Sequence, residues 1–225
     1  MSTALPKAMV IVNGDDVHHD LISAALVYQQ IGIEAGFVTR RAMGLSRFVN
    51  PEPVTADNDV FLFYTAGGVF ATPQQQALAE MVAAGKGAVA VHGANIMGWD
   101  GDKIAEAWKP LFKLFGSHYV SHGPGHHEGY HQVDVIAPEH PIMQGVSTFK
   151  LFDEYYEFNQ HDDDIEVLAT RTRADGTKCP IVYTRNVGKG RVVYVALGHD
   201  MRSWGEPPAR QILRQALRWA SGITA

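Results

Sequence analysis

The chain has 225 residues, of which 46% are hydrophobic and 19% are charged, a balance typical of a globular protein with one sizeable core. We therefore expect a single domain over residues 1–225. The net charge of −5 argues against a nucleic-acid partner, and the lack of a long apolar run argues against a membrane span. The single cysteine, Cys179, excludes a disulfide framework. Together with the lack of a secretory signal, it predicts a cytoplasmic location.

The first half of the chain alternates short apolar runs with helical patterns. The apolar runs are rich in β-branched residues and predict four strands: Ala8–Asn13, Glu34–Thr39, Asp59–Thr65 and Gly87–His92. Apolar residues at helical spacing predict three helices: His19–Ile31, Gln74–Ala84 and Ile104–Phe115. Strands that are apolar throughout are typical of a parallel sheet covered on both faces. This half therefore predicts an α/β fold with a doubly wound, mostly parallel sheet.

From Gly116 onwards the pattern changes to a segment rich in His and Gly, followed by further apolar runs. These runs predict four more strands: Tyr130–Ile136, Glu166–Thr172, Pro180–Thr184 and Arg191–Leu197. Asn186–Lys189 predicts a hairpin turn between the last two strands, and Pro207–Ala220 predicts an amphipathic helix. We therefore expect a C-terminal antiparallel hairpin that extends the parallel sheet.

Histidines follow several of the predicted strands. His18 and His19 come after the first strand, His92 ends the fourth, and His199 follows the last long strand with Asp200 beside it. Ligands of such sheets bind at the carboxyl ends of the strands, so these side chains are candidates for one shared site. The alternative for each of them is a loop histidine that is bonded only to backbone.

His92 lies in a local pattern that resembles a nucleophile elbow. In Val91-His92-Gly93-Ala94 a strand is followed by one polar residue and then by small residues, although the G-x-S-x-G motif itself is missing. An imidazole at that position can serve as a general base or as a metal ligand, and the sequence leaves both roles open.

A second group of histidines lies in the glycine-rich segment. Glycines at 123, 125 and 129 argue against a helix there, and so against a zinc helix of the H-E-x-x-H type. A surface loop is the alternative to a metal or substrate site, and the roles of most of these residues stay open. The group comprises His118, His122, His126, His127 and His131.

Carboxylates cluster in Phe152-Asp153-Glu154-Tyr155-Tyr156-Glu157. A carboxylate near histidines can act as a general acid or base or can bind a metal, whereas a solvated acidic turn is the alternative. Cys179 precedes Pro180 at a strand start without an elbow context, which favours a structural role for it.

The order and spacing of several motifs resemble the ThuA-like (trehalose utilisation) family. The resemblance runs from about residue 8 to residue 220. The motifs are Val91-His92-Gly93-Ala94, Leu114-Phe115-Gly116 with His122, Glu139-His140-Pro141-Ile142 with Gly145, Asp153-Glu154 with Tyr156, Gly188-Lys189-Gly190-Arg191-Val192-Val193-Tyr194, and Leu197-Gly198-His199-Asp200 with Trp204.

The resemblance implies the class I glutamine amidotransferase-like fold, a flavodoxin-like architecture. In true amidotransferases the elbow carries a nucleophilic cysteine. His92 takes that place here, which implies that the chain is not a glutaminase. His199 is similar in position to the catalytic histidine of those enzymes. The family is associated with sugar catabolism, often beside oxidoreductases that handle 3-keto sugars. Many relatives have proline after the residue that matches His122, whereas this chain has Gly123.

These observations predict an enzyme of carbohydrate catabolism that acts on a sugar or keto-sugar derivative, as a hydrolase, lyase or isomerase. The alternative is a non-catalytic sugar-binding or regulatory module on the same scaffold. Three histidines and one carboxylate would suit a divalent Zn, Ni or Fe ion better than Mg. A homo-oligomer is compatible with the aromatic loops. The expected catalytic residues are His92, His199 and Glu154; the expected substrate-binding residues are His19, His122, Tyr156 and Trp204; and the expected metal ligands are His19, His92, Glu154 and His199.

Overall fold

The apolar runs of the first half form adjacent strands of one sheet. A computed structural model describes residues 4–14, 18–49, 53–67, 70–95, 99–100, 103–104, 109–160 and 164–223. Its first four strands are β1 (Lys7–Gly14), β2 (Val38–Met43), β3 (Val60–Ala66) and β4 (Gly87–Val91). Every residue of β3 and β4 is buried, as the unbroken apolar runs predict. Strand β2 begins later than predicted because the preceding helix continues to Glu34.

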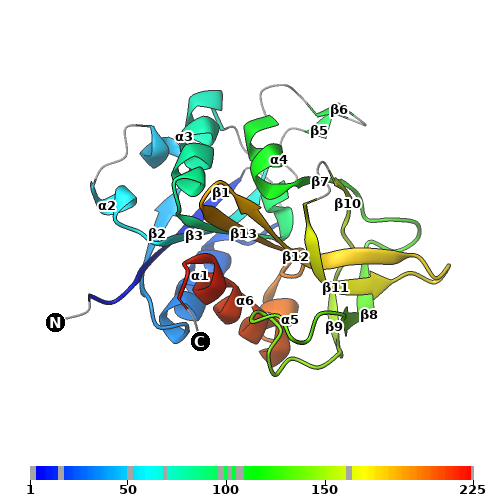
Figure 1. Cartoon of the computed structure of the whole chain (residues 1–225). Coiled ribbons are helices and arrows are strands. Elements are labelled where there is room, and N and C mark those ends of the chain that lie inside the picture. Colours follow the sequence, from blue (N-terminus) through cyan, green and yellow to red (C-terminus); the bar gives the residue numbers. More distant parts are fainter. Residues whose placement is uncertain are drawn as a thin grey trace.

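Four longer helices cover this part of the sheet. They are α1 (Leu21–Glu34), α3 (Thr72–Ala83), α4 (Lys109–Phe115) and α6 (Pro207–Ala220). Helices α1 and α6 pack together on one face, and α3 and α4 lie on the other (Figure 1). The helix predicted from Ile104 is wrong at its start, since Ile104 belongs to a short strand. Residues 105–108 lie outside the described residues, and α4 is described from Lys109.

The remaining strands run through the antiparallel part of the molecule. They are β7 (Ser117–Ser121), β8 (Glu128–Val135), β9 (Phe149–Glu154), β10 (Glu157–Gln160), β11 (Glu166–Thr172), β12 (Lys178–Val187) and β13 (Gly190–Val195). Short elements complete the described chain: η1 (Ser46–Phe48), α2 (Pro53–Ala56), η2 (His92–Asn95), β5 (Trp99–Asp100), β6 (Lys103–Ile104) and α5 (Met201–Trp204).

The main sheet is mixed, so the predicted doubly wound, mostly parallel sheet is wrong. Its nine strands lie in the order β2-β1-β3-β4-β13-β12-β11-β8-β9. Pairing is parallel from β2 to β13, in the strand order of flavodoxin-like sheets, and antiparallel from β13 to β9. The predicted β12–β13 hairpin is present, but it is only the first pair of a larger antiparallel part (Figure 1).

Short connections explain this difference. Parallel neighbours need a crossover of a dozen or more residues, usually through a helix, whereas antiparallel neighbours can be joined by a short turn. Val187 pairs with Gly190 across the Gly188-Lys189 turn, and Thr172 pairs with Lys178 across another short loop. The chain from β11 to β13 therefore folds back on itself and leaves no room for crossover helices.

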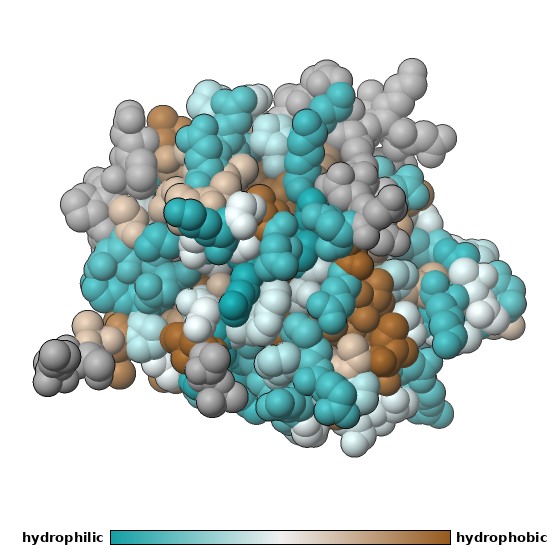
Figure 2. All heavy atoms as spheres, in the orientation of Figure 1, coloured by the Kyte–Doolittle hydropathy of each residue, from teal (hydrophilic) through white to brown (hydrophobic). Residues whose placement is uncertain are grey.

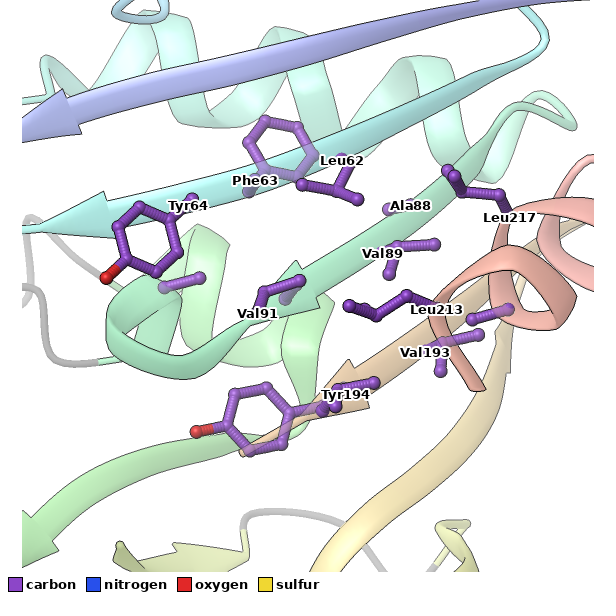
Figure 3. Close-up of a cluster of buried hydrophobic side chains, with 14 of the residues drawn as sticks. Leu62, Phe63, Tyr64, Ala88, Val89, Val91, Val193, Tyr194, Leu213 and Leu217 are labelled. Carbon is purple, nitrogen blue, oxygen red and sulfur yellow. The ribbon is translucent and has the colours of Figure 1, made fainter. Parts of the chain in front are cut away.

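The hydrophobic core continues through the parallel strands and reaches their carboxyl ends. Leu213 and Leu217 of α6 pack beside valines of β4 and β13, while Tyr64 and Tyr194 extend their hydroxyl groups beyond that apolar cluster (Figure 3). Full burial of each large apolar side chain stabilises the fold by roughly 1.5–3 kcal/mol. The two tyrosines join this core to the polar groups at the strand ends.

The outer surface is mainly hydrophilic in the view of Figure 2, with an apolar patch over the antiparallel strands. Among the described residues, no helix has both the length and the hydropathy needed to cross a bilayer.

Candidate active site

Three histidines meet at the carboxyl edge of the parallel strands. His19 lies between β1 and α1, His92 follows β4, and His199 follows β13. Strands β1, β3, β4 and β13 are neighbours in the sheet, so their carboxyl ends lie together. The ring centroid of His19 is 5.3 Å from that of His92 and 4.9 Å from that of His199. The centroids of His92 and His199 are 5.3 Å apart. Asp15 and Asp16, which precede His19 in sequence, lie outside the described residues.

His92 is held in a strained backbone conformation. Its φ of 48° is the only positive value at a non-glycine residue in the described part of the chain. Such conformations cost about 1–3 kcal/mol and cluster at functional sites. The following residue must be small, because a Cβ atom on Gly93 would lie 2.6 Å from the Thr65 carbonyl oxygen. The elbow-like pattern in the sequence thus corresponds to a tight turn that lifts the imidazole above the sheet.

Hydrogen bonds orient the His92 ring. Nδ1 is 2.8 Å from the Ala196 carbonyl oxygen, which can only accept, so Nδ1 carries the proton and Nε2 is the free acceptor. The hydroxyl of Tyr194 donates to the His92 carbonyl oxygen at 3.0 Å. Strand β13 and the turn after it therefore fix both the backbone and the tautomer of His92.

Glu154, the last residue of β9, completes the group from the antiparallel part of the sheet. Its Oε2 lies 3.2 Å from His92 Nε2 and 3.1 Å from His199 Nδ1. One ligand atom from each of Glu154, His92, His199 and His19 lies within 4.8 Å of the other three. The Oε2 of Glu154, Nε2 of His92 and Nδ1 of His199 are buried, and none has a partner in hydrogen-bond geometry. We call these four residues the His/Glu centre.

Charge is distributed unevenly in the His/Glu centre. Burial would raise the pKa of Glu154, but the contact with His199, which favours its protonated form, outweighs it and holds that pKa well below its usual range. Burial lowers the pKa of His92 despite its contact with Glu154, so this ring is neutral at pH 7. Burial also acts against charge on His199, yet its neighbouring carboxylates raise its pKa. One imidazole is thus a neutral base and the other favours its protonated form.

A second set of residues holds the turn that carries His199. The buried carboxylate of Asp153 accepts hydrogen bonds from the backbone N–H groups of Gly198, at 2.7 Å, and His199, at 3.0 Å. Burial raises the pKa of Asp153 to about 7 in spite of these bonds. Tyr64 donates to the His199 carbonyl oxygen at 2.8 Å. The sequence does not predict these roles of Asp153 and Tyr64, although Asp153 lies in the acidic segment that contains Glu154.

The predicted substrate-binding aromatics lie in two different environments. Tyr156 stacks on His92 with centroids 4.1 Å apart, and its buried hydroxyl has no hydrogen-bond partner in the described residues. Trp204 is 2% exposed, donates from Nε1 to the Gly198 carbonyl oxygen at 2.6 Å and packs edge-on against Tyr64. Tyr156 thus borders the His/Glu centre directly, whereas Trp204 supports the His199 turn from within the core.

The histidines of the glycine-rich segment do not enter the His/Glu centre. His122 lies nearest, with its ring 5.5 Å from that of Tyr156 and its Nδ1 3.0 Å from the Tyr155 carbonyl oxygen. The His122 ring also stacks on the His127 ring, with the two centroids 4.8 Å apart. His118 and His131 are buried among other side chains, and His126 is exposed.

The donor set of the His/Glu centre fits a first-row divalent metal ion. It offers three imidazole nitrogens and one carboxylate oxygen, which suit Zn, Ni or Fe. Ligand atoms about 2.0–2.2 Å from a tetrahedral ion are about 3.4 Å from one another. The separations of Glu154 Oε2 from His92 Nε2 and His199 Nδ1, 3.2 and 3.1 Å, are close to that spacing, although both involve the same carboxylate oxygen. The same groups without an ion form an acid–base pair.

Comparison with known proteins identifies relatives of the whole chain. A ThuA-like protein from Parabacteroides merdae has a similar structure, with a TM-score of 0.79 and 17% identity over 98% of this chain and 92% of that one. One from Bacteroides uniformis has a TM-score of 0.73 at 17% identity, over 98% and 94% of the two chains. A β-galactosidase from Bacillus circulans sp. alkalophilus matches with a TM-score of 0.62 and 15% identity. The match covers 96% of this chain but only 31% of the β-galactosidase chain.

At these identities the structural matches show the fold alone. No curated protein matches the chain. The model of the ThuA family, described as trehalose utilisation, matches residues 7–220, which confirms the resemblance found in the sequence. With nearly its whole length covered by that model, the chain belongs to the ThuA family.

Proposed function

We propose that the chain is an enzyme of carbohydrate catabolism whose His/Glu centre binds a divalent Zn, Ni or Fe ion and acts on a sugar or keto-sugar derivative. The observation that carries this proposal is the meeting of four potential ligand atoms within 4.8 Å of one another. Three of these atoms are buried without a partner in hydrogen-bond geometry, and a metal ion would satisfy them.

Different residues of the centre serve in binding and in proton transfer. A bound metal ion would supply a Lewis acid for a carbonyl or hydroxyl oxygen of the sugar. His92 Nε2, kept free of a proton by the Nδ1 contact, faces that position as a ligand or base. His199 beside Glu154 can hold a proton for the reacting oxygen. Tyr156 covers the His92 ring and keeps water from that side.

Glutamine hydrolysis is not expected from this centre. The elbow position after β4 holds His92, and an imidazole there does not replace the thiolate of an amidotransferase. Cys179, the single cysteine, is buried in β12 and is not among the residues of the centre. We therefore expect Cys179→Ser to change sugar-directed activity by no more than a few-fold.

Metal content tests the centre directly. The purified protein, loaded with Zn, Ni or Fe and dialysed, should retain about one ion per chain by mass spectrometry. His92→Ala and His199→Ala should each lose most of it, because both remove a ligand. The double variant His126→Ala/His127→Ala, which removes two exposed histidines outside the centre, is the control and should retain the ion. Metal that is lost from the control but kept by the other two variants would contradict the proposal.

Turnover separates the enzyme from its alternative, a non-catalytic sugar-binding module. The metal-loaded protein should convert at least one member of a panel of 3-keto sugars and plain disaccharides, as measured by chromatography of the products. Conversion should fall by orders of magnitude in His199→Ala. Sugar binding without conversion of any member would favour the module instead.

The cytoplasmic location of the protein and its self-association remain predictions.

A further inference from the structure

The antiparallel part of the sheet contains a groove of about 700 Å³ that is separate from the His/Glu centre. It opens because β8 and β11 pair only at Val135 with Ala169 and at Asp134 with Thr170. The side chain of Tyr155 lies between the two strands, with its ring 5.3 Å from His131 of β8 and 4.6 Å from the guanidinium of Arg171 of β11. The volume is in the range of small-molecule sites.

Opposite charges balance in the walls of the groove. Three cations face three carboxylates, and His131 adds no charge at pH 7 because burial lowers its pKa to about 4. A site for a phosphate or carboxylate ligand would carry an excess of cations. The balance therefore favours an uncharged ligand. The charged residues are Lys150, Arg171, Arg173, Asp134, Glu157 and Asp175.

The polar groups of the groove offer both donors and acceptors. Glu157 forms an ion pair with Arg173, and its Oε1 faces Nη2 of Arg171 at 3.6 Å; these two buried atoms have no partner in hydrogen-bond geometry. At the rim, the exposed amide of Gln132 donates to Asp134 at 2.6 Å and keeps its own carbonyl oxygen for a ligand. Such mixed, planar groups match hydroxyls, each of which donates and accepts.

Aromatic rings provide the apolar part of the surface. Tyr155 is half-buried at the junction of the two strands, and Tyr130, 78% exposed, stands at the rim with Phe152 edge-on beneath it. Aromatic rings present apolar faces together with a polar hydroxyl, which suits a ring that has both C–H and O–H surfaces.

We propose that this groove is a binding site for a neutral saccharide of one or two rings. It adjoins the His/Glu centre through His122, which lines the groove and whose ring is 5.5 Å from that of Tyr156. The site requires no metal in the centre, so its test is independent of the proposed enzymatic function.

Calorimetric titration of the metal-free full chain tests the groove. The neutral probes are glucose, maltose and trehalose, and the anionic probes are glucuronate and inorganic phosphate. We expect a neutral sugar to bind and Gln132→Ala to weaken it about tenfold, the effect of losing one or two hydrogen bonds. Gln30→Ala, which changes an exposed glutamine of α1, is the matched control and should bind as wild type does. His92→Ala should also retain the affinity.

Three results would overturn the proposal. In the first, neutral sugars do not bind, or only glucuronate and phosphate do. In the second, Gln132→Ala binds sugar as wild type does. In the third, His92→Ala weakens sugar binding as much as Gln132→Ala, which would place the sugar in the centre. If the chain retains no metal but the sugar titrations give the expected results, the proposed enzymatic function is contradicted and the saccharide site is supported.

Discussion

The parallel and antiparallel parts of the sheet bury their strands differently. Strands β3 and β4 are buried at every position and lie between two layers of helices, whereas β8 alternates between buried and exposed residues. The His/Glu centre takes its three histidines from the parallel part and its carboxylate from the end of β9. A rigid, helix-covered framework thus fixes the imidazoles, while the more open part supplies the acid and the groove.

The largest expected effect concerns Asp153, which joins the two parts. Asp153→Asn keeps the shape but places an NH2 donor against one of the two backbone N–H groups of Gly198 and His199, so it should lower the free energy of unfolding by about 2–3 kcal/mol. Metal retention in the centre should fall too, because the His199 turn loses its support. Urea denaturation and metal analysis measure the two effects. Asp134→Asn, at a half-buried position of β8 whose carboxylate accepts exposed hydrogen bonds from Gln132 and Thr172, is the control and should change both little.

A variant Asp153→Asn with unchanged stability and unchanged metal content would show that the parallel part holds the His199 turn without help from β9.

A smaller effect, confined to the antiparallel part, is expected from His131. Burial lowers its pKa to about 4 in the folded state, against about 6.5 when unfolded. The unfolded chain therefore binds the proton more readily, and stability is full above pH 6.5 and falls as the pH drops towards 4. Between pH 7 and pH 5 His131 should account for a loss of about 2 kcal/mol.

His131→Gln removes that titration, so its unfolding free energy should fall less steeply than that of wild type between pH 7 and pH 5. His126→Gln, at an exposed position, should keep the wild-type slope. Equal slopes in all three proteins would mean that His131 is not buried as a neutral ring.

The smallest effect is expected from Arg202, which also bridges the two parts. Its guanidinium contacts Asp200 beside the centre and Glu128 at the start of β8, and lies 4.3 Å from the centre of the Phe152 ring. Because the side chains are largely exposed, Arg202→Ala should lower the unfolding free energy by less than about 1 kcal/mol. Raising the salt concentration should reduce the difference between the variant and wild type. If Arg202→Ala lowers the unfolding free energy as much as Asp153→Asn does, the surface contact of Arg202, and not the buried carboxylate of Asp153, is the main link between the two parts of the sheet.

Local patterns predicted several elements well. The range of α6 matches its prediction because an amphipathic period and a leading Pro-Pro pair mark that helix without reference to the rest of the chain. The β12–β13 hairpin followed likewise from Gly188 and its neighbours. His19, His92 and His199 could be chosen as candidates because each lies at or shortly after the end of an apolar strand, which is information carried within a few residues.

Strand pairing and the side chains that face each other depend on contacts between distant parts of the chain. The apolar runs from residue 130 onwards do not say whether their neighbours run parallel or antiparallel, since pairing joins residues far apart in the chain. Asp153 and Glu154 are adjacent in sequence, yet one supports a backbone turn and the other enters the His/Glu centre, because successive strand residues point to opposite sides. The groove exists only because β8 and β11 diverge after two pairs, a consequence of packing around Tyr155 that no local pattern records.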